Sequence, residues 1–264
     1  MTISRKFRYG WLVPPIAIIL AFAAWYLFDP GFSGSRKIVE TNQVQGEFEQ
    51  RVRNYLIQNP EVLVEAMQVL EERRRAEEQN EAQVAIAQYR DELLFSEHSP
   101  VVGNPQGKVT LVEFFDYNCP YCRQVAPLMD EALTTDPDLR IVYKEFPILG
   151  PNSVFAAKAA LAAARQDAYQ QFHEAIMAST GSADEAGVLA IAEQLKLDME
   201  KLRSDMQSPE IQAEIERNLK LASALRINGT PGFVIGEEIV RGATNLETMK
   251  SLIDKARDDL KEVR

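Results

Sequence analysis

The sequence predicts an α/β catalytic domain with an inserted helical subdomain, preceded by a helical stalk and an N-terminal transmembrane segment. Three observations lead to this prediction: an early apolar run without charge, amphipathic helical patterns after it, and strand patterns separated by long helical ones in the C-terminal part. Strands that alternate with helices are typical of a sheet covered by helices. We expect three segments, at residues 1–28, 29–97 and 98–264.

The composition is that of an acidic globular protein. Hydrophobic residues make up 46% of the chain and charged residues 26%, which is ordinary for a packed domain. The formal net charge is -10, and no basic stripe interrupts the acidic sequence, so nucleic acid is not expected as a partner. The only two cysteines, Cys119 and Cys122, are too few for a disulfide-stapled domain.

Residues 11–28 predict a single membrane crossing. They contain no charged residue and reach about 27 Å as a helix, close to the thickness of a bilayer core. Three cationic residues precede them, which places everything after Asp29 on the far side of the membrane, in a bacterial cell the periplasm. We expect an uncleaved anchor in the inner membrane. A cleaved signal peptide is the alternative, because Ala21–Ala23 forms an A-x-A pattern.

Two short amphipathic helices are predicted in the stalk, after a polar tether that contains Gly34 and Ser35. The first spans 47–58, and the second follows with Asn59 as its N-cap and Pro60 as its first residue. Helices this short cannot bury a core of their own, so we expect association with other copies of the chain. Packing back onto the catalytic domain is the alternative. The apolar stripe of the two helices consists of Phe48, Val52, Tyr55, Leu56, Leu63, Met67 and Leu70.

The segment Glu71–Gln83 carries no apolar stripe. Eight of its 13 residues are charged, so it is either a solvated helix held by pairs such as Glu71 with Arg75 or a linker that frays.

The two cysteines lie where a strand turns into a helix. Val109–Phe115 is a nearly continuous apolar run, typical of a central strand buried on both faces. Pro120 at the first helical position makes Cys119 the N-cap, where its sulfur is expected to accept backbone N–H bonds. The helix N-terminus should lower the pKa of Cys119, while Cys122 is shielded one turn inside. Cys119 is therefore predicted to attack and Cys122 to resolve.

Cys-x-x-Cys also occurs in metal sites and in protein cores. A structural zinc site wants four ligands, and His98 and His173 are the only histidines. Copper(I) held by both thiolates is the stronger alternative, because soft sulfur suits Cu(I). Two inert core cysteines would be poorly placed at such a turn. We expect no cofactor and no resident metal.

The remaining elements follow from periodicity. A second strand spans 140–146, and the gap from Pro147 to Gly229 is far longer than a simple crossover needs. It predicts a helical insertion over about 153–226, with helices at 153–179, 184–195 and 209–225. A hairpin at 232–236 and 239–242 turns at 237–238, and a last helix runs from a capping-box pattern at 244–247 to about 260.

Three motifs together resemble the DsbA-like branch of the thioredoxin superfamily: Phe114–Cys122, Lys144–Pro147 and Gly229–Phe233. The resemblance covers about residues 98–264 and implies a thioredoxin-like fold. It also implies a cis bond between Thr230 and Pro231, in a loop beside the cysteines.

A buried glutamate in that family lies six residues before the first cysteine, which implies the same place for Glu113. An unpaired carboxylate inside an apolar strand is costly, so a partner or a raised pKa is expected. We expect Lys144 as the partner and a proton relay to Cys122 as the role. An outward-facing strand residue is the alternative.

The stalk carries a second resemblance. Tyr55-Leu56 followed by 59–63 is similar to the stalk of suppressor-of-copper-sensitivity C proteins, DsbA-like enzymes of which some are trimeric disulfide isomerases. It implies a homo-oligomer, with a trimer as one form. The charged segment Glu71–Gln83 departs from this pattern.

These features predict a periplasmic thiol-disulfide oxidoreductase acting on unfolded or misoxidised proteins. Tyr121, where strongly oxidising relatives commonly have histidine, and Thr230 before Pro231 favour an isomerase or reductase. A disulfide-donating oxidase and a copper(I)-delivery protein are the alternatives. Either direction of redox chemistry implies a membrane redox partner. Tyr117, Tyr121 and Phe233 are candidates for lining a substrate groove.

Overall fold

The computed structural model describes the backbone of residues 34–262 and the side chains of residues 45–261. The chain divides into two compact units, Met1–Glu72 and Arg73–Arg264, which are described in turn. The predicted membrane-spanning segment at 11–28 lies outside the described residues. Among the residues that are described, no helix is both long and apolar enough to cross a bilayer.

The first unit contains helix α2 (Gly34–Gln58) and the start of α3 (Glu61–Gln88). The helix predicted at 47–58 is thus present but begins earlier, and Gly34 and Ser35 are helical rather than part of a tether. No proline lies between Pro30 and Pro60, so nothing in this stretch removes a backbone donor from the helical ladder.

The junction between α2 and α3 differs from the prediction. The side-chain nitrogen of Asn59 donates to the Tyr55 carbonyl at 2.9 Å, and the backbone nitrogen of Asn59 donates to the same carbonyl at 2.8 Å. Asn59 therefore closes the end of α2 instead of capping α3, which begins one residue after Pro60. The prediction of Asn59 as N-cap and Pro60 as first helical residue was wrong, because the free carbonyls of α2 compete for the same amide.

The apolar stripe of the stalk is exposed. Most of its side chains are more than two fifths accessible, Met67 reaching 64%, and Phe48, Val52, Leu56 and Leu63 line an apolar groove. The charged segment that follows is helical, because α3 runs without interruption to Gln88. Pairs one turn apart support it, as between Arg74 and Glu78 at 3.4 Å.

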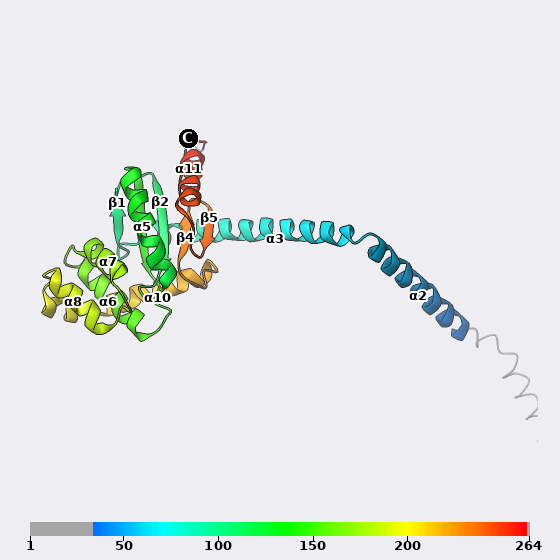
Figure 1. The fold of residues 1–264 in the computed structure, drawn as a ribbon, viewed down its shortest axis with the longest axis horizontal. Helices are drawn as coiled ribbons and strands as arrows, with labels where there is room; N and C mark the ends of the chain where they lie inside the picture. Colours follow the sequence, from blue (N-terminus) through cyan, green and yellow to red (C-terminus); the bar gives the residue numbers. More distant parts are fainter. Residues whose placement is uncertain (1–33, 263–264) are drawn as a thin grey trace, which may run out of the picture. The chain divides into compact units, whose positions relative to one another are not determined.

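The second unit is built on a five-stranded sheet of order β1-β3-β2-β4-β5 (Figure 1). Strand β2 is central, as predicted, and is parallel to β3, while the other pairs are antiparallel. The predicted second strand and hairpin are each present within one residue of the expected bounds. The strands are β1 (Val101–Gly103), β2 (Val109–Phe115), β3 (Leu139–Glu145), β4 (Gly232–Ile235) and β5 (Glu238–Arg241).

The helical insertion gathers beside one end of the sheet (Figure 1). The helix predicted at 153–179 is two helices, because Asp167 adopts a left-handed conformation with φ of 57° between them. Helix α9 was not predicted; it is short and begins at Met199, directly after Asp198, whose carboxylate caps it. The insertion comprises α6 (Pro151–Ala164), α7 (Tyr169–Ala178), α8 (Glu185–Gln194), α9 (Met199–Asp205) and α10 (Pro209–Ala224).

Two apolar cores lie on opposite faces of the sheet. Leu111 and Phe115 of β2 face a core shared with α5 (Pro120–Thr135), α6, α7 and α11 (Leu246–Glu262). Val112 and Phe114 face a core shared with α4 (Arg90–Leu94), α10 and the end of α3. Successive side chains of a strand point to opposite faces, so the position of a polar residue in a strand decides whether its side chain reaches the face that packs against α5.

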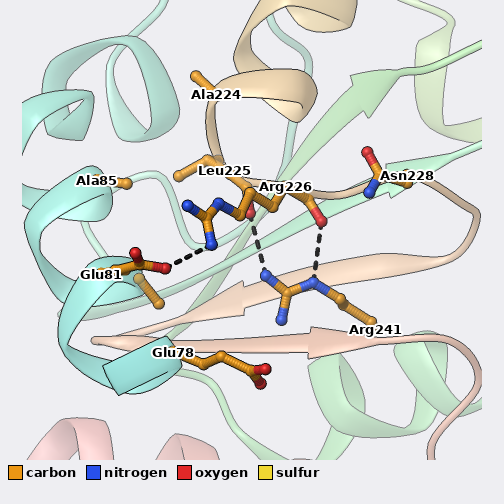
Figure 2. A pocket seen from close by; sticks show the side chains of 9 residues that line it. Glu78, Glu81, Ala85, Ala224, Leu225, Arg226, Asn228 and Arg241 are labelled. Atoms are coloured by element: carbon orange, nitrogen blue, oxygen red, sulfur yellow. Dashed lines mark hydrogen bonds and ion pairs between the residues drawn. The ribbon is translucent and has the colours of Figure 1, made fainter. Parts of the chain in front are cut away.

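The C-terminal end of α3 belongs to the second unit. Ile86 joins the second core, and Glu81 forms an ion pair with Arg226 beyond α10 (Figure 2). Arg241 of β5 donates to the carbonyls of Leu225 and Arg226 at 3.2 and 3.0 Å. The pocket between these elements includes neither cysteine among its lining residues.

The last helix begins one residue later than the expected capping box. The side chain of Asn245, not Thr244, accepts from the backbone nitrogen of Thr248 at 2.8 Å.

A buried polar network on the second core ties α4 and α10 to β3. The Lys144 ammonium donates to the Glu92 carbonyl and to the Ser99 hydroxyl, both at 2.7 Å, and that hydroxyl donates to Glu214 at 2.8 Å. Burial lowers the pKa of Lys144 to about 8, which leaves the side chain charged at neutral pH.

Lys144→Met should lower the free energy of unfolding by about 2–4 kcal/mol at pH 7, because it leaves the Glu92 carbonyl and the Ser99 hydroxyl without their buried donor and Glu214 with Arg217 as its remaining cation. Urea denaturation measures the change. Arg217→Met is the matched control, since Arg217 pairs with the same carboxylate but is 40% exposed, and it should cost less than about 1 kcal/mol. Equal losses in the two variants would contradict this account of the network.

Candidate active site

The dithiol begins helix α5. Cys119 is the N-cap in an extended conformation, and Pro120 is the first helical residue, as predicted. Both cysteines are free thiols, with Cys119 4% and Cys122 0% exposed. The strand-to-helix turn thus holds one sulfur at the surface of the core and the other beneath it.

The Cys119 sulfur is directed toward the loop before β4. Its thiol donates to the Thr230 carbonyl at 3.3 Å, and it accepts no hydrogen bond from the first turn of α5. The N–H bonds predicted for this sulfur are therefore wrong for the thiol form, because a protonated sulfur is a weak acceptor and the facing carbonyl a strong one. The bond between Thr230 and Pro231 is cis, as the resemblance implied.

Cys122 is held in its protonated form. Burial is the main cause of a raised pKa for its thiol, and the negative charge of Glu113 is the second. A base must therefore remove the proton before this sulfur attacks a disulfide.

Glu113 lies in the middle of β2, level with Tyr143 of β3 and Phe233 of β4. It is 2% exposed, and burial raises the pKa of its carboxyl to about 8. The raised pKa was expected. The predicted pair of Glu113 with Lys144 was wrong, because Lys144 lies one position further along β3 and faces the opposite core. The outward-facing alternative is wrong as well.

Asp116 organises the turn, and it was missed in the sequence. Its carboxylate accepts from the backbone nitrogens of Asn118 and Ile148 at 2.8 Å and of Leu149 at 2.9 Å. An aspartate directly after a strand and two residues before a turn amide is the pattern of an Asx turn. That signal could have found it.

Asn118 and Arg123 fasten the turn to its surroundings. The Asn118 amide accepts from the backbone of Ala183 at 2.8 Å and donates to Ser153 at 3.1 Å, both in the helical insertion. Arg123, on the first turn of α5, donates to the Tyr117 carbonyl at 2.8 Å. The dithiol is thus positioned by bonds that reach beyond its own helix.

The exposed side chains near the turn differ from those expected. Tyr117 and Phe233 belong to the core, whereas Tyr121 is 61% exposed. Ile148 and Leu149, whose amides Asp116 holds, are exposed too. The apolar side chains exposed beside the turn are therefore Tyr121, Ile148 and Leu149, whereas the buried Tyr117 and Phe233 are not placed to line a groove.

The part of the chain that the structure describes contains no group of three or more acidic, histidine and cysteine side chains placed to hold a metal ion. His173, one of the two histidines, is enclosed in the core by aromatic rings. The arrangement at the cysteines supports sulfur chemistry by two thiols and one carboxyl.

Comparison with known families agrees with this geometry. The family model of the DSBA-like thioredoxin domain matches residues 110–254, and that of the copper resistance protein ScsC N-terminal domain matches residues 45–77. The chain belongs to the DsbA-like thioredoxin-domain family of thiol-disulfide oxidoreductases, and its stalk matches the N-terminal domain of ScsC.

Solved structures include three close relatives. A thioredoxin-like oxidoreductase from Silicibacter pomeroyi is 47% identical, with a TM-score of 0.63, over 64% of this chain and 98% of that one. BcfH from Salmonella enterica Typhimurium is 31% identical, with a TM-score of 0.69, over 85% and 99%. ScsC from Proteus mirabilis in a compact conformation is 32% identical, with a TM-score of 0.58, over 75% and 99%.

Among curated proteins, the Na(+)/H(+) antiporter NhaA 1 of Salinispora arenicola is 31% identical over 158 residues, which is 59% of this chain. The match spans about a quarter of the length of that relative.

Glu113→Gln should flatten the dependence of stability on pH. The folded state keeps the Glu113 proton up to about pH 8, while the unfolded state releases it near its ordinary pKa of 4.5. The stability that Glu113 contributes by holding this proton is thus complete below pH 4.5 and is lost as pH rises to 8. Between pH 5 and pH 9 the wild type should lose roughly 3–5 kcal/mol more than the variant, measured by urea unfolding. Parallel losses in both proteins would contradict a neutral buried Glu113.

Proposed function

We propose that the chain is a protein thiol-disulfide oxidoreductase that acts through Cys119 and Cys122. The observation that carries the proposal is the placement of the dithiol: one sulfur at a helix N-terminus against the Thr230 carbonyl, the other buried with Glu113 near enough to raise its pKa. A helix N-terminus favours a thiolate at its cap.

The exchange begins when the Cys119 thiolate attacks a substrate disulfide. A bond forms between Cys119 and one substrate sulfur, and the other substrate sulfur leaves as a thiolate. The pKa of about 8 leaves a minor fraction of Glu113 ionised near neutral pH. In the second step this ionised form accepts the proton of Cys122, whose sulfur attacks the Cys119 sulfur of the mixed disulfide. The enzyme disulfide forms and the second substrate thiolate is released, so the substrate is reduced by two electrons and the enzyme oxidised by two. The reverse sequence donates a disulfide.

Isomerisation needs only the first step. The released substrate thiolate attacks another disulfide of the same substrate, and a substrate thiolate then displaces Cys119 unchanged, with no net transfer of electrons. We favour isomerase or reductase activity, because Tyr121 places no cation beside the dithiol. A disulfide-donating oxidase is the alternative.

The stalk supports oligomerisation in this proposal. Its stripe exposes apolar side chains along α2 and α3, and such patches mark interaction sites. The match to the ScsC N-terminal domain lies on the same residues. We propose that copies of the chain associate through the stripe, with a trimer as one form.

Localisation in the periplasm, tethered to the inner membrane by residues 11–28, is also part of the proposal and rests on sequence alone. The substrates would be unfolded or misoxidised proteins, and a membrane redox partner would maintain the dithiol.

Cys122→Ala should accumulate a mixed disulfide with a protein substrate that contains scrambled disulfides, because the resolving sulfur is gone. Non-reducing electrophoresis after acid quenching detects the adduct. Cys119→Ala is the control and should form none, since Cys122 is fully buried. Thiol exchange that survives Cys119→Ala would refute the mechanism.

A copper(I)-delivery role, favoured by the name of the matching stalk family, gives a different outcome in the same variants. In the wild type, stoichiometric Cu(I) would protect both thiols from alkylation. The Cys122→Ala variant would trap no substrate.

Val52→Asp should dissociate the oligomer, because it places a carboxylate in the apolar groove that Val52 lines with Phe48 and Leu56. Light scattering measures the mass, and reactivation of scrambled ribonuclease in a glutathione buffer measures isomerisation. We expect a monomer that loses most reactivation but still reduces a small disulfide. Asn54→Asp, on the other face of α2, is the control. Full reactivation by a monomeric Val52→Asp would contradict the role of the stalk.

A further inference from the structure

A buried polar cluster lies directly beneath the turn that carries Cys119. It consists of Tyr117, Glu145, Tyr169 and His173, each no more than 7% exposed. The hydroxyls of Tyr169 and Tyr117 reach the same oxygen of Glu145, at 2.9 and 3.2 Å, and the Tyr117 hydroxyl lies 3.2 Å from His173 Nδ1. We call these four residues the polar cluster.

The hydrogen bonds of the polar cluster are mutually consistent for neutral groups. If both tyrosines donate to Glu145, Nδ1 of His173 carries the hydrogen and donates to the Tyr117 oxygen. Burial lowers the pKa of His173 to about 3, so the imidazole is neutral at pH 7, and burial also raises the pKa of Glu145. The three hydrogen bonds join side chains from β3, α7 and the turn before α5, so the polar cluster is suited to holding Tyr117 in position.

Tyr117 links this cluster to the dithiol. It stands two residues before Cys119, and its carbonyl accepts from Arg123, which directly follows Cys122. Its ring packs edge-on against Phe115, with centroids 5.0 Å apart. The hydroxyl end of Tyr117 is thus fixed to β3 and α7, while its backbone is fixed to the first turn of α5.

The neighbouring residue on β3 provides a comparison within the molecule. Lys144 belongs to an equally buried network with Ser99 and Glu214 on the opposite face of the sheet. Within the described part of the chain, no side-chain hydrogen bond joins that network to the turn that carries the cysteines, so it stabilises the fold without holding them.

We propose that Glu145, acting through Tyr117, is a positioning residue that favours the dithiol over the disulfide. The proposal rests on the thiol-disulfide function proposed above. The polar cluster is complete in a structure whose cysteines are both free thiols and whose Cys119 thiol donates to Thr230. Disulfide formation removes that donor and draws the two sulfurs to about 2.05 Å. A turn anchored from below resists this movement.

The experiment measures the equilibrium between the full-length protein and glutathione. Protein dithiol and glutathione disulfide give protein disulfide and two glutathione thiols, so two electrons and two protons pass to glutathione. At a fixed buffer composition, Tyr117→Phe and Glu145→Leu should lower the dithiol-to-disulfide ratio about fivefold, the equivalent of one buried neutral hydrogen bond. Glu145→Gln should stay within about twofold, because its amide oxygen accepts both hydroxyls.

Ser99→Ala is the matched control. It breaks the network on the opposite face and should destabilise the protein by about 1–3 kcal/mol without moving the ratio, with urea unfolding confirming the loss. The proposal is overturned if Tyr117→Phe leaves the ratio unchanged or raises it, or if Ser99→Ala lowers it equally. Tyr117→Phe alone decides the outcome should Glu145→Leu fail to fold.

Failure of the proposed function would look different. A wild-type protein that forms no disulfide in any glutathione buffer would refute the redox role itself, before any variant is compared. A wild type that equilibrates normally, with variants that do not differ from it, would refute only the role of Glu145.

Discussion

The parallel register of β2 and β3 is the constraint on which the active site depends. It aligns Glu113 with Tyr143 and Phe115 with Glu145. Because side chains alternate between faces, both acids face the core shared with α5, and Lys144 faces away. A slip of one residue would exchange these faces and put a lysine beneath the dithiol. The pairing of β2 with β3 thus decides which titratable side chains face the core that contains Cys122.

The turn between β2 and α5 is fixed by groups from three directions. Asp116 collects backbone amides from the loop after β3, Asn118 bonds to the helical insertion, and Tyr117 reaches the polar cluster. Each bond joins the turn to a different part of the fold. A helix N-terminus alone would favour a thiolate, but these contacts determine where the sulfurs stand relative to Thr230 and Glu113. The long insertion therefore contributes to the site as well as to the core.

The sequence allowed much of the fold to be predicted, because the strong signals are local. The apolar run of β2, the proline at the start of α5 and the Thr-Pro motif each identify their element without knowledge of the rest. The failures concern choices between partners. Asn59 had two helix ends within reach, Lys144 had two faces, and the Cys119 thiol had a carbonyl opposite that no local pattern reveals. The polar cluster was missed for the same reason, since its members come from β3, α7 and the catalytic turn and meet only after the sheet is paired.

The stalk presents the opposite energetic situation to the catalytic unit. Its helices leave a continuous apolar stripe in water, and each large apolar side chain gains about 1.5–3 kcal/mol when buried. Most of the stability of a helix in a protein comes from packing its amphipathic face, so burial against other copies would stabilise the helices and the assembly together. Under the association we propose, stalk folding would depend on protein concentration, whereas the catalytic unit buries its own cores. A single chain would then combine a dithiol domain that folds on its own core with a stalk whose helices are stabilised by other copies of the chain.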